Sequence, residues 1–302
     1  MSVPSLFLDV LGPVVVLVAI GAVAGPRLNI DLPSLSSLAY VVLGPAFVFD
    51  LFTASDLGPA TVGRLVLAGI IGMVAAVAVS FGANRAAGST ATVTSASMMT
   101  SAYGNVGNAG LAITVFALGE EALAAAGVLM LTINIVGITT GVGLATGQNE
   151  GAFGGLRKAL TAPMTLAALL AGTINLFGLT PPLIVSRPIG LLGGALIPVM
   201  LFTLGLQLAS TGLRRPSPDL GITIVSKLAI APLAATAAAA ALGLTGDLLG
   251  AVAIQSAMPP AVFCMLVALE HDLELERVTT AVVSTTIASL VTLPIVLMLS
   301  QA

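Results

Sequence analysis

The chain has 302 residues, of which 57% are hydrophobic and only 8% are charged, and its net charge is −3. A soluble protein of this length carries about 25% charged residues, so the composition excludes a soluble globular protein. No basic patch supports nucleic-acid binding, and the single cysteine, Cys264, allows no internal disulfide. The composition predicts an integral membrane protein embedded in a lipid bilayer.

Charged residues separate ten apolar runs, and a spanning helix needs about 20 mostly apolar residues. Lys and Arg fall mostly in alternate loops, seven against two, if the N-terminus lies outside. This bias predicts that both termini lie outside and that the membrane is the plasma (inner) membrane of a prokaryote. The ten predicted spans are 4–25, 34–54, 60–83, 90–117, 122–146, 161–179, 188–211, 219–243, 247–269 and 278–300.

The two halves of the chain, 1–146 and 159–302, repeat the same features in the same order. The second span contains Pro45 in the sequence LGPAFVF, and the seventh span contains Pro198 in the sequence LIPVMLF. Because each half has five spans, an odd number, the second half enters the membrane from the opposite side. We therefore predict a single all-α transmembrane domain over 1–302, built from two inverted five-helix repeats.

One span in each half is interrupted. Span four carries three glycines and two asparagines between Gly104 and Gly110, and span nine carries Pro259–Pro260. Each Gly costs about 1 kcal/mol relative to Ala inside a helix, and each Asn needs a hydrogen-bond partner in lipid. Such segments are tolerated where a helix breaks and its backbone lines a protected cavity, so they predict the binding site of a transporter.

The broken segments resemble those of the auxin efflux carrier family, which includes plant PIN-type exporters and bacterial carriers of organic acids. The resemblance rests on Pro45 and on four further stretches: GNVGNAGL (104–111), SAMPPAVF (256–263) followed by Asp272, VSTT (283–286) and LVTLP (290–294). Three features depart from the family: Ala112 stands where a proline is usual, Asn108 stands where an apolar residue is common and so predicts a more polar pocket, and the central loop is short. That short loop argues against a regulated plant-type carrier.

The resemblance implies a fold like that of NhaA or the bile-acid carriers, in which spans four and nine cross. It also implies a homodimer built on a scaffold of spans one, two, six and seven. Spans three to five and eight to ten would move as a transport unit in an elevator mechanism.

Helices that begin at mid-membrane point their positive N-terminal ends into the cavity, where they suit a carboxylate. We expect new helices to begin near 108–111 and near 260–263, and the substrate to be a small organic anion. Asn134 and Gln207 either line the site or join helices. The predicted substrate-binding residues are Tyr103, Asn105, Gly107, Asn108, Gly110, Gln255, Met258, Pro259, Pro260, Pro45, Phe49 and Pro198.

Ionisable residues inside spans are functional candidates by default. A desolvated Asp50 would favour its protonated form and could take up a proton in each cycle; alternatively, span two ends a turn earlier and Asp50 lies at the interface with Asp56. Lys227 is the second candidate for proton coupling, and its side chain either pairs with Asp219 or extends its amino group toward the inner surface. Sodium coupling is the alternative to proton coupling. His271 lies in a charged loop, so we expect no metal site, and no cofactor is indicated.

Other functional classes fit the sequence less well. An intramembrane protease of the rhomboid type needs a buried histidine, whereas His271 lies in a charged loop. The aspartyl type needs two membrane aspartates in a GxGD setting, and neither Asp9 nor Asp50 has that setting. A channel would need a selectivity-filter repeat or a ring of charges, and neither is present. The sequence therefore predicts a carrier rather than an enzyme.

Overall fold

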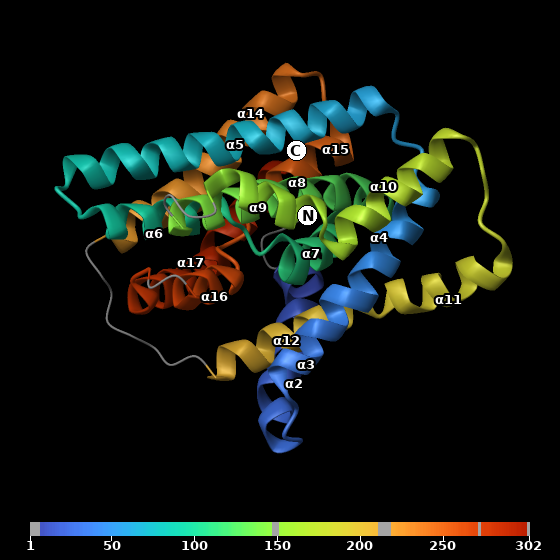
Figure 1. Cartoon of the computed structure of the whole chain (residues 1–302), viewed down its shortest axis with the longest axis horizontal. Coiled ribbons are helices and arrows are strands. Elements are labelled where there is room, and N and C mark those ends of the chain that lie inside the picture. The colour runs from blue at the N-terminus through green and yellow to red at the C-terminus, as the bar shows by residue number, and fades with distance from the viewer. Residues whose placement is uncertain (1–6, 147–150, 211–218, 271–272, 301–302) are drawn as a thin grey trace.

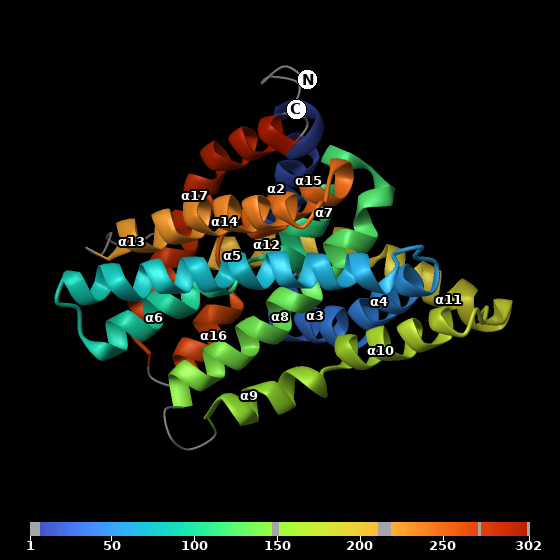
Figure 2. The ribbon, with the colours of Figure 1, turned by 90° about the horizontal axis from the view of Figure 1, so that it is seen from above.

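The computed structural model describes residues 7–146, 151–210, 219–270 and 273–300. Within these residues the regular structure is helical, apart from one isolated antiparallel bridge (Figures 1 and 2). The first half contains η1 (Phe7–Leu11), α2 (Gly12–Arg27), α3 (Leu32–Leu38), η2 (Ala39–Leu43), α4 (Gly44–Thr53), α5 (Pro59–Ala86), α6 (Ala91–Ala102), η3 (Val106–Gly110), α7 (Leu111–Leu118), η4 (Glu120–Ala122) and α8 (Leu123–Thr146).

The second half begins with a short helix before the sixth predicted span. Its elements are α9 (Gly151–Leu160), α10 (Pro163–Leu176), α11 (Leu183–Gly194), α12 (Leu196–Ser210), α13 (Leu220–Val225), η5 (Ser226–Ile230), α14 (Ala231–Ala241), α15 (Gly246–Ser256), α16 (Phe263–Glu270) and α17 (Leu275–Ser300). The prediction of an all-helical chain is confirmed.

Seven helical stretches of the described residues are long and apolar enough to cross a membrane. The pair Phe153–Leu160 and Pro163–Leu176, bent by 58°, makes an eighth if it forms one span. The two remaining predicted spans, 90–117 and 247–269, are the ones that break: α6 is followed by η3 and α7, and α15 is followed by α16. Ten crossings arranged as an inverted repeat remain a prediction.

The helices pack in two groups. The first group comprises α2, α3, η2, α4, α10, α11 and α12. In this group α2 runs along α12, and α4 packs against α10 and α11. In the second group, which comprises α5 to α8 and α13 to α17, α5 contacts α6, α8 and α14, while α15 contacts α17. Figure 1 shows α5 and α14 at the upper edge and α2 and α12 at the lower edge.

Several helices begin where the sequence supplies a capping side chain or an early proline. Asp31 accepts a hydrogen bond from the backbone N–H of Ser34 (2.9 Å). Hydrogen bonds with the side chain and with the backbone of Ser34 hold the pKa of the Asp31 carboxyl below the ordinary value. Thr90 caps α6 through the N–H of Val93 (3.3 Å). Proline occupies the first or second position of α5 and α10, where its missing N–H would have had no partner in the helix.

Four five-residue π-helical segments interrupt the regular α-helical pattern. Such segments are rare and often occur at functional sites. Here η2 and η3 both supply residues that line a cavity, and η5 carries Lys227.

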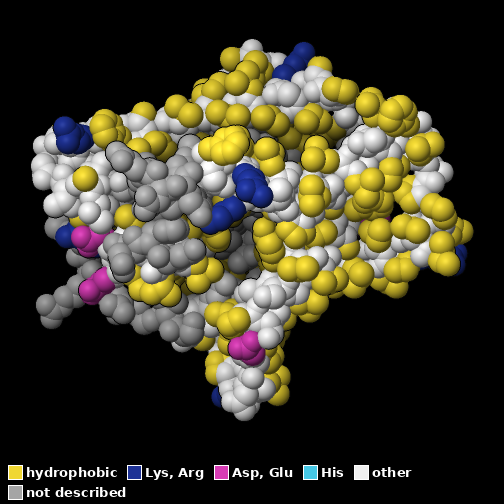
Figure 3. Space-filling view, viewed as in Figure 1, with side chains coloured by type: hydrophobic (Ala, Val, Ile, Leu, Met, Phe, Trp, Pro, Cys, Tyr) yellow, Lys and Arg dark blue, Asp and Glu magenta, His cyan; other side chains and the backbone are white. Residues whose placement is uncertain are grey.

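The surface shown in Figure 3 is mostly apolar, as a membrane-embedded chain requires, and Lys and Arg side chains gather over α9. Close contact between α2 and α12 depends on glycine. A methyl group added at Gly205 would overlap backbone atoms of Val18 and Ala22, and one added at Gly21 would overlap the backbone of Phe202. Small residues permit this approach of two backbones, which is a common basis of helix association in membranes.

We predict that Gly205→Ala destabilises the protein by about 1–3 kcal/mol, because α2 and α12 must separate to accommodate the methyl group. Thermal unfolding in detergent measures the effect. The matched control is Gly82→Ala in α5, where nothing lies within 4 Å of the added methyl group. That control should leave the midpoint unchanged or raise it, since Ala is the better helix former by about 1 kcal/mol. Equal midpoints for the two variants would contradict the packing role of Gly205.

Candidate functional site

The two broken helices cross where their extended segments pair with each other. α6 ends at Ala102 and α15 ends at Ser256, and an antiparallel bridge joins Gly104 to Pro260. The N–H of Asn105 donates to the carbonyl of Pro259 (2.7 Å), and the N–H of Ala261 donates to the carbonyl of Tyr103 (3.1 Å). Each break therefore satisfies backbone groups freed by the other, as lipid surroundings demand.

The position of proline in this bridge has a physical reason. In an antiparallel pair, facing residues alternate between those that exchange hydrogen bonds and those that do not. Gly104 and Pro260 face each other without exchanging bonds, because the two bonds come from Asn105 and Ala261. Pro260 can thus stop the helix without leaving a missing donor in the bridge.

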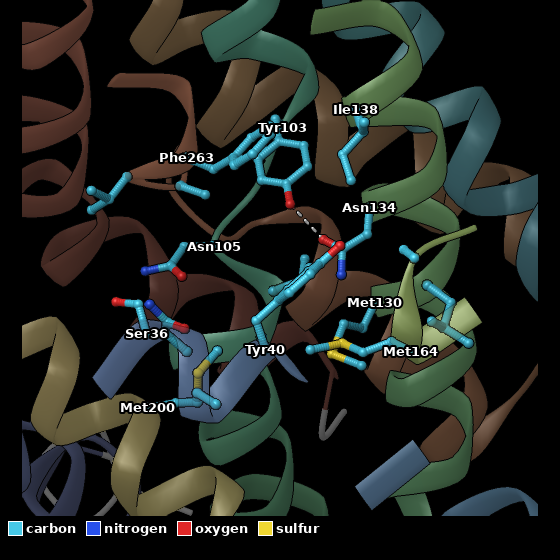
Figure 4. Close-up of a pocket in the computed structure, with 18 of the residues that line it drawn as sticks. Ser36, Tyr40, Tyr103, Asn105, Met130, Asn134, Ile138, Met164, Met200 and Phe263 are labelled. Atoms are coloured by element: carbon cyan, nitrogen blue, oxygen red, sulfur yellow. Dashed lines mark hydrogen bonds between the residues drawn. The ribbon is translucent and has the colours of Figure 1, made fainter. Parts of the chain in front are cut away.

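A cavity of about 420 Å³ lies against the crossing (Figure 4). Its walls come from both helix groups: α3, η2, α10 and α12 from the first, and the 103–108 segment, α8 and α16 from the second. Ala159 and Ala162, near the end of α9, also line it, so the basic pair Arg157 and Lys158 precedes the cavity wall directly in sequence.

Aromatic and amide side chains make up one side of this cavity. The hydroxyl of Tyr103 donates to Oδ1 of Asn134 on α8 (2.8 Å), and its ring lies 5.1 Å from that of Phe263. Figure 4 shows Tyr40 beside Asn134, with Asn105 across the cavity from them. Both tyrosines of the chain thus line the same cavity. Three methionine side chains add soft apolar surface that can adapt to a ligand: Met130, Met164 and Met200.

None of the described residues that line this cavity is charged. The positive character comes instead from backbone: the N-terminal residues of η3 and of α16 both line the cavity, and the first N–H groups of a helix have no partner within it. Together with Asn105, Asn108 and Asn134, these ends offer several neutral donors. The arrangement can hold one small anion by hydrogen bonds and helix dipoles.

Lys227 lies directly behind the crossing. The residue is 1% exposed, and its Nζ donates to the carbonyl of Ser256 at the end of α15 (3.3 Å). A methyl group on Gly104 would stand 3.1 Å from Nζ, so the missing side chain there lets the lysine reach the bridge. A cation suits the negative C-terminal ends of α6 and α15. Among the described residues, no carboxylate forms a salt bridge with Lys227.

This placement corrects both sequence-based expectations for Lys227. Its amino group does not extend to the surface, because the side chain is fully buried. Nor does it pair with Asp219, whose carboxylate forms an ion pair with Arg277. The expectation failed because the burial of Lys227 depends on its position in η5 and on its contact with the bridge, and neither is visible in a single apolar segment.

The structure brings four predicted binding residues to the cavity: Tyr103, Asn105, Gly107 and Asn108. The first new helix begins at Val106, slightly before the expected 108–111, and the second begins at Phe263, as expected. The other predicted residues of the two breaks lie behind the cavity wall. They are Gly110, which packs on Gln255; Gln255, which donates to Thr114 (3.3 Å); buried Met258; and the bridge prolines Pro259 and Pro260.

The residues predicted from spans two and seven do not reach this cavity. Pro45 and Phe49 line a separate apolar groove with residues of α10 and α11, and Pro198 is exposed. Asp50 lies on the protein surface, in the last turn of α4 near Gly190, and its proton uptake stays a prediction. His271 and Asp272 lie outside the described residues.

Two cavity features escaped the sequence-based site prediction. Tyr40 carried a faint signal, since only two tyrosines occur in the chain and the other was predicted. Asn134 was left between lining the site and joining helices; in the structure it does both, because it lines the cavity and bonds to Tyr103.

Comparison with known proteins finds a family that resembles part of the chain. Residues 153–297, just under half of the chain, match the family model described as membrane transport protein. This match agrees with the family resemblance seen in the sequence and with the prediction of a transporter rather than an enzyme. The family and the seven apolar helices together support a multi-pass membrane protein.

Two curated relatives share part of the chain. An uncharacterized transporter of Methanothermobacter thermautotrophicus is 30% identical over 193 residues, which is 63% of this chain and 63% of that protein. A putative malonate transporter of Rhizobium meliloti is 26% identical over 199 residues, 63% of this chain and 62% of that protein. The aligned region thus covers less than two thirds of either relative.

We predict that Gly104→Ala lowers the thermal stability by about 1–3 kcal/mol, because the methyl group must push Lys227 from the carbonyl of Ser256 or loosen the bridge. Thermal unfolding in detergent tests this, with Gly107→Ala as the control. A methyl group at Gly107 meets the flexible end of Met200 at 3.3 Å, which can move aside. If Gly107→Ala proves as damaging as Gly104→Ala, the close fit of Lys227 is not what stabilises the crossing.

Proposed function

We propose that the protein is a secondary carrier that moves small organic anions across the membrane, binding them where the two broken helices cross. The observation that carries this proposal is the uncharged cavity lined by two helix N-terminal ends and by Asn105 and Asn108. The family match of residues 153–297 agrees with it.

The electrostatics of the crossing favour an anion. Four helix ends meet there, two N-terminal and two C-terminal, so their dipoles would otherwise largely cancel. Lys227 approaches the C-terminal ends from behind, through its bond to Ser256, and offsets their negative charge. The N-terminal ends that line the cavity are then left with their positive character, so we assign the carboxylate of the substrate to them.

The size and walls of the cavity support a small substrate. About 420 Å³ holds a compact organic acid, and the tyrosine, phenylalanine and methionine side chains would cover an apolar body. The Rhizobium meliloti relative is named for malonate. Malonate and auxin-like aromatic monocarboxylates are therefore the two probes to compare, as examples of a dianion and a monoanion.

The helix packing supports alternating access. We assign the first helix group to the scaffold and the second to the moving transport unit, with the cavity between them. A second cavity, of about 670 Å³, lies among α5, α8 and α10 and shares Leu131, Ile135 and Thr165 with the first. A thin wall of these three residues would then separate access from the two sides, as an elevator mechanism needs.

For the coupling ion we favour a proton over sodium. A buried cation at Lys227 disfavours a sodium ion bound to the neighbouring carbonyls. Asp50 lies on the protein surface and away from the crossing, so we do not assign the proton to it. A homodimer in the plasma membrane, with both termini outside, completes the proposal.

The direct test is uptake by purified protein in proteoliposomes, with radiolabelled malonate and indole-3-acetate as probes. Asn105→Ala should lower kcat/KM for the transported probe by at least about tenfold, because the side-chain amide of Asn105 supplies a hydrogen-bond donor that alanine lacks. Thr173→Ala is the control: the hydroxyl of Thr173 donates to the carbonyl of Leu169 within α10 (2.7 Å), on an exposed face and away from the crossing.

Saturable uptake that survives Asn105→Ala at the level of Thr173→Ala would contradict the assigned site. Absence of saturable uptake of either probe by the unmodified protein, in the presence of an imposed substrate gradient, would count against a carrier of small carboxylates.

A further inference from the structure

A row of buried polar side chains runs through the second helix group, away from the substrate cavity. The hydroxyls of Ser80 on α5 and Ser97 on α6 share a hydrogen bond (3.0 Å), and Ser97 shares another with Thr223 on α13 (3.1 Å). Asn84 lies one turn from Ser80 and donates to its carbonyl (2.9 Å). All four residues are at most 3% exposed. Polar side chains inside a membrane are costly, and they commonly mark a functional site.

The row continues toward the crossing on two helices. Ser101 lies one turn beyond Ser97 on α6, while Ser226 and Lys227 lie one turn beyond Thr223. Because Ser97 touches Thr223 and Gly104 lies close to Lys227, the two helices run parallel in this region. The polar positions therefore advance in step from the end of α5 to the amino group of Lys227.

Several atoms along the row are left without a partner. Oδ1 of Asn84, Oγ of Ser101 and Oγ of Ser226 are buried and make no hydrogen bond in the structure. A buried polar atom without a partner destabilises the folded protein, and water molecules usually satisfy such groups. Three unpartnered atoms spaced along one row thus indicate sites for bridging water.

None of these side chains lines the 420 Å³ cavity, so the row is separate from the substrate site. One end lies beside Arg85, in the last turn of α5, where the helix reaches the predicted inner surface. The other end is Lys227, which contacts the crossing. We propose that this row, completed by water, conducts protons between the inner surface and the amino group of Lys227.

The transfer balances as a relay. A proton from water at the Asn84 end passes to a bridging water or hydroxyl, which releases its own proton to the next. The last transfer converts the neutral amine of Lys227 to an ammonium, and the reverse sequence returns the proton to water. Asn84 itself orients water and is not protonated.

The surroundings of Lys227 leave it as the group that changes charge. Cys264 of α16 is the titratable side chain that interacts with it electrostatically. On the other elements packed against η5, the described charged residues lie at helix ends: Arg64 and Arg85 of α5, Asp219 before α13, and Glu276 and Arg277 of α17. No described residue of α6 or α14 is charged.

Hydration of the row can be tested without any substrate. In a Cys264→Ala background, we place single cysteines at Ser97 or Ser101 and expose the proteoliposomes to silver ions. If water reaches these positions, silver binds the thiols, and after unfolding they no longer react with N-ethylmaleimide. Ala96→Cys is the matched control, since Ala96 is equally buried on the same helix but packs in an apolar cluster. Protection at 97 and 101 but not at 96 supports the path; equal protection at all three, or at none, overturns it.

Proton movement is tested in the chain that keeps Cys264. Pyranine-loaded proteoliposomes report protons that enter with a malonate gradient, and exchange of labelled for unlabelled malonate reports the carrier. Thr223→Val removes the central hydroxyl while keeping its shape. We expect proton entry to fall at least tenfold while exchange stays unchanged, and Thr223→Ser to restore proton entry.

Unchanged proton entry in Thr223→Val would overturn the path. The coupling depends on the proposed function, and the two can fail separately. Malonate exchange without proton movement by the unmodified protein overturns the proton path and leaves the carrier. If no malonate exchanges, the proposed malonate transport fails, and the silver experiment decides the path by itself.

Discussion

The structure depends on a short antiparallel bridge between residues 103–105 and 259–261, which two backbone hydrogen bonds hold together. These bonds, from Asn105 to Pro259 and from Ala261 to Tyr103, let two helices stop inside an apolar protein without leaving their backbones unsatisfied. In lipid each unsatisfied group would cost several kcal/mol, so neither break could exist without the other. The crossing is thus a single unit, although its two strands are separated by about half the chain.

The charge pattern follows from that constraint. Two broken helices bring both positive N-terminal ends and negative C-terminal ends to one point. A site that binds an anion there requires another group to offset the negative charge of the C-terminal ends. Lys227 does this from the side away from the cavity, because Gly104 has no side chain to keep it at a distance. In the proposed carrier, an anionic substrate would meet neutral donors rather than a fixed cation. Neutral donors would allow release as well as binding, which a carrier requires.

The breaks themselves were readable from the sequence, because glycine, asparagine and paired prolines are local signals. The all-helical fold and most helix positions followed from charge-free runs of suitable length. Tertiary contacts could not be predicted in this way. The sequence indicated that Lys227 extends to the surface or pairs with Asp219, but its burial depends on η5 and on Gly104, more than a hundred residues away. Pro45 and Pro198 repeat between the halves, yet repetition shows equivalence rather than contact with the cavity.

The most direct measurement of the central claim is hydrogen–deuterium exchange of the backbone amides in detergent, with and without malonate or indole-3-acetate. We expect slow exchange at Asn105 and Ala261 in either condition, because both amides are held in the bridge. Anion should further slow the amides of 106–108 and 262–263, while those of α10 stay unchanged. Fast exchange at Asn105 and Ala261, together with no response of the two helix starts to either anion, would contradict the central claim.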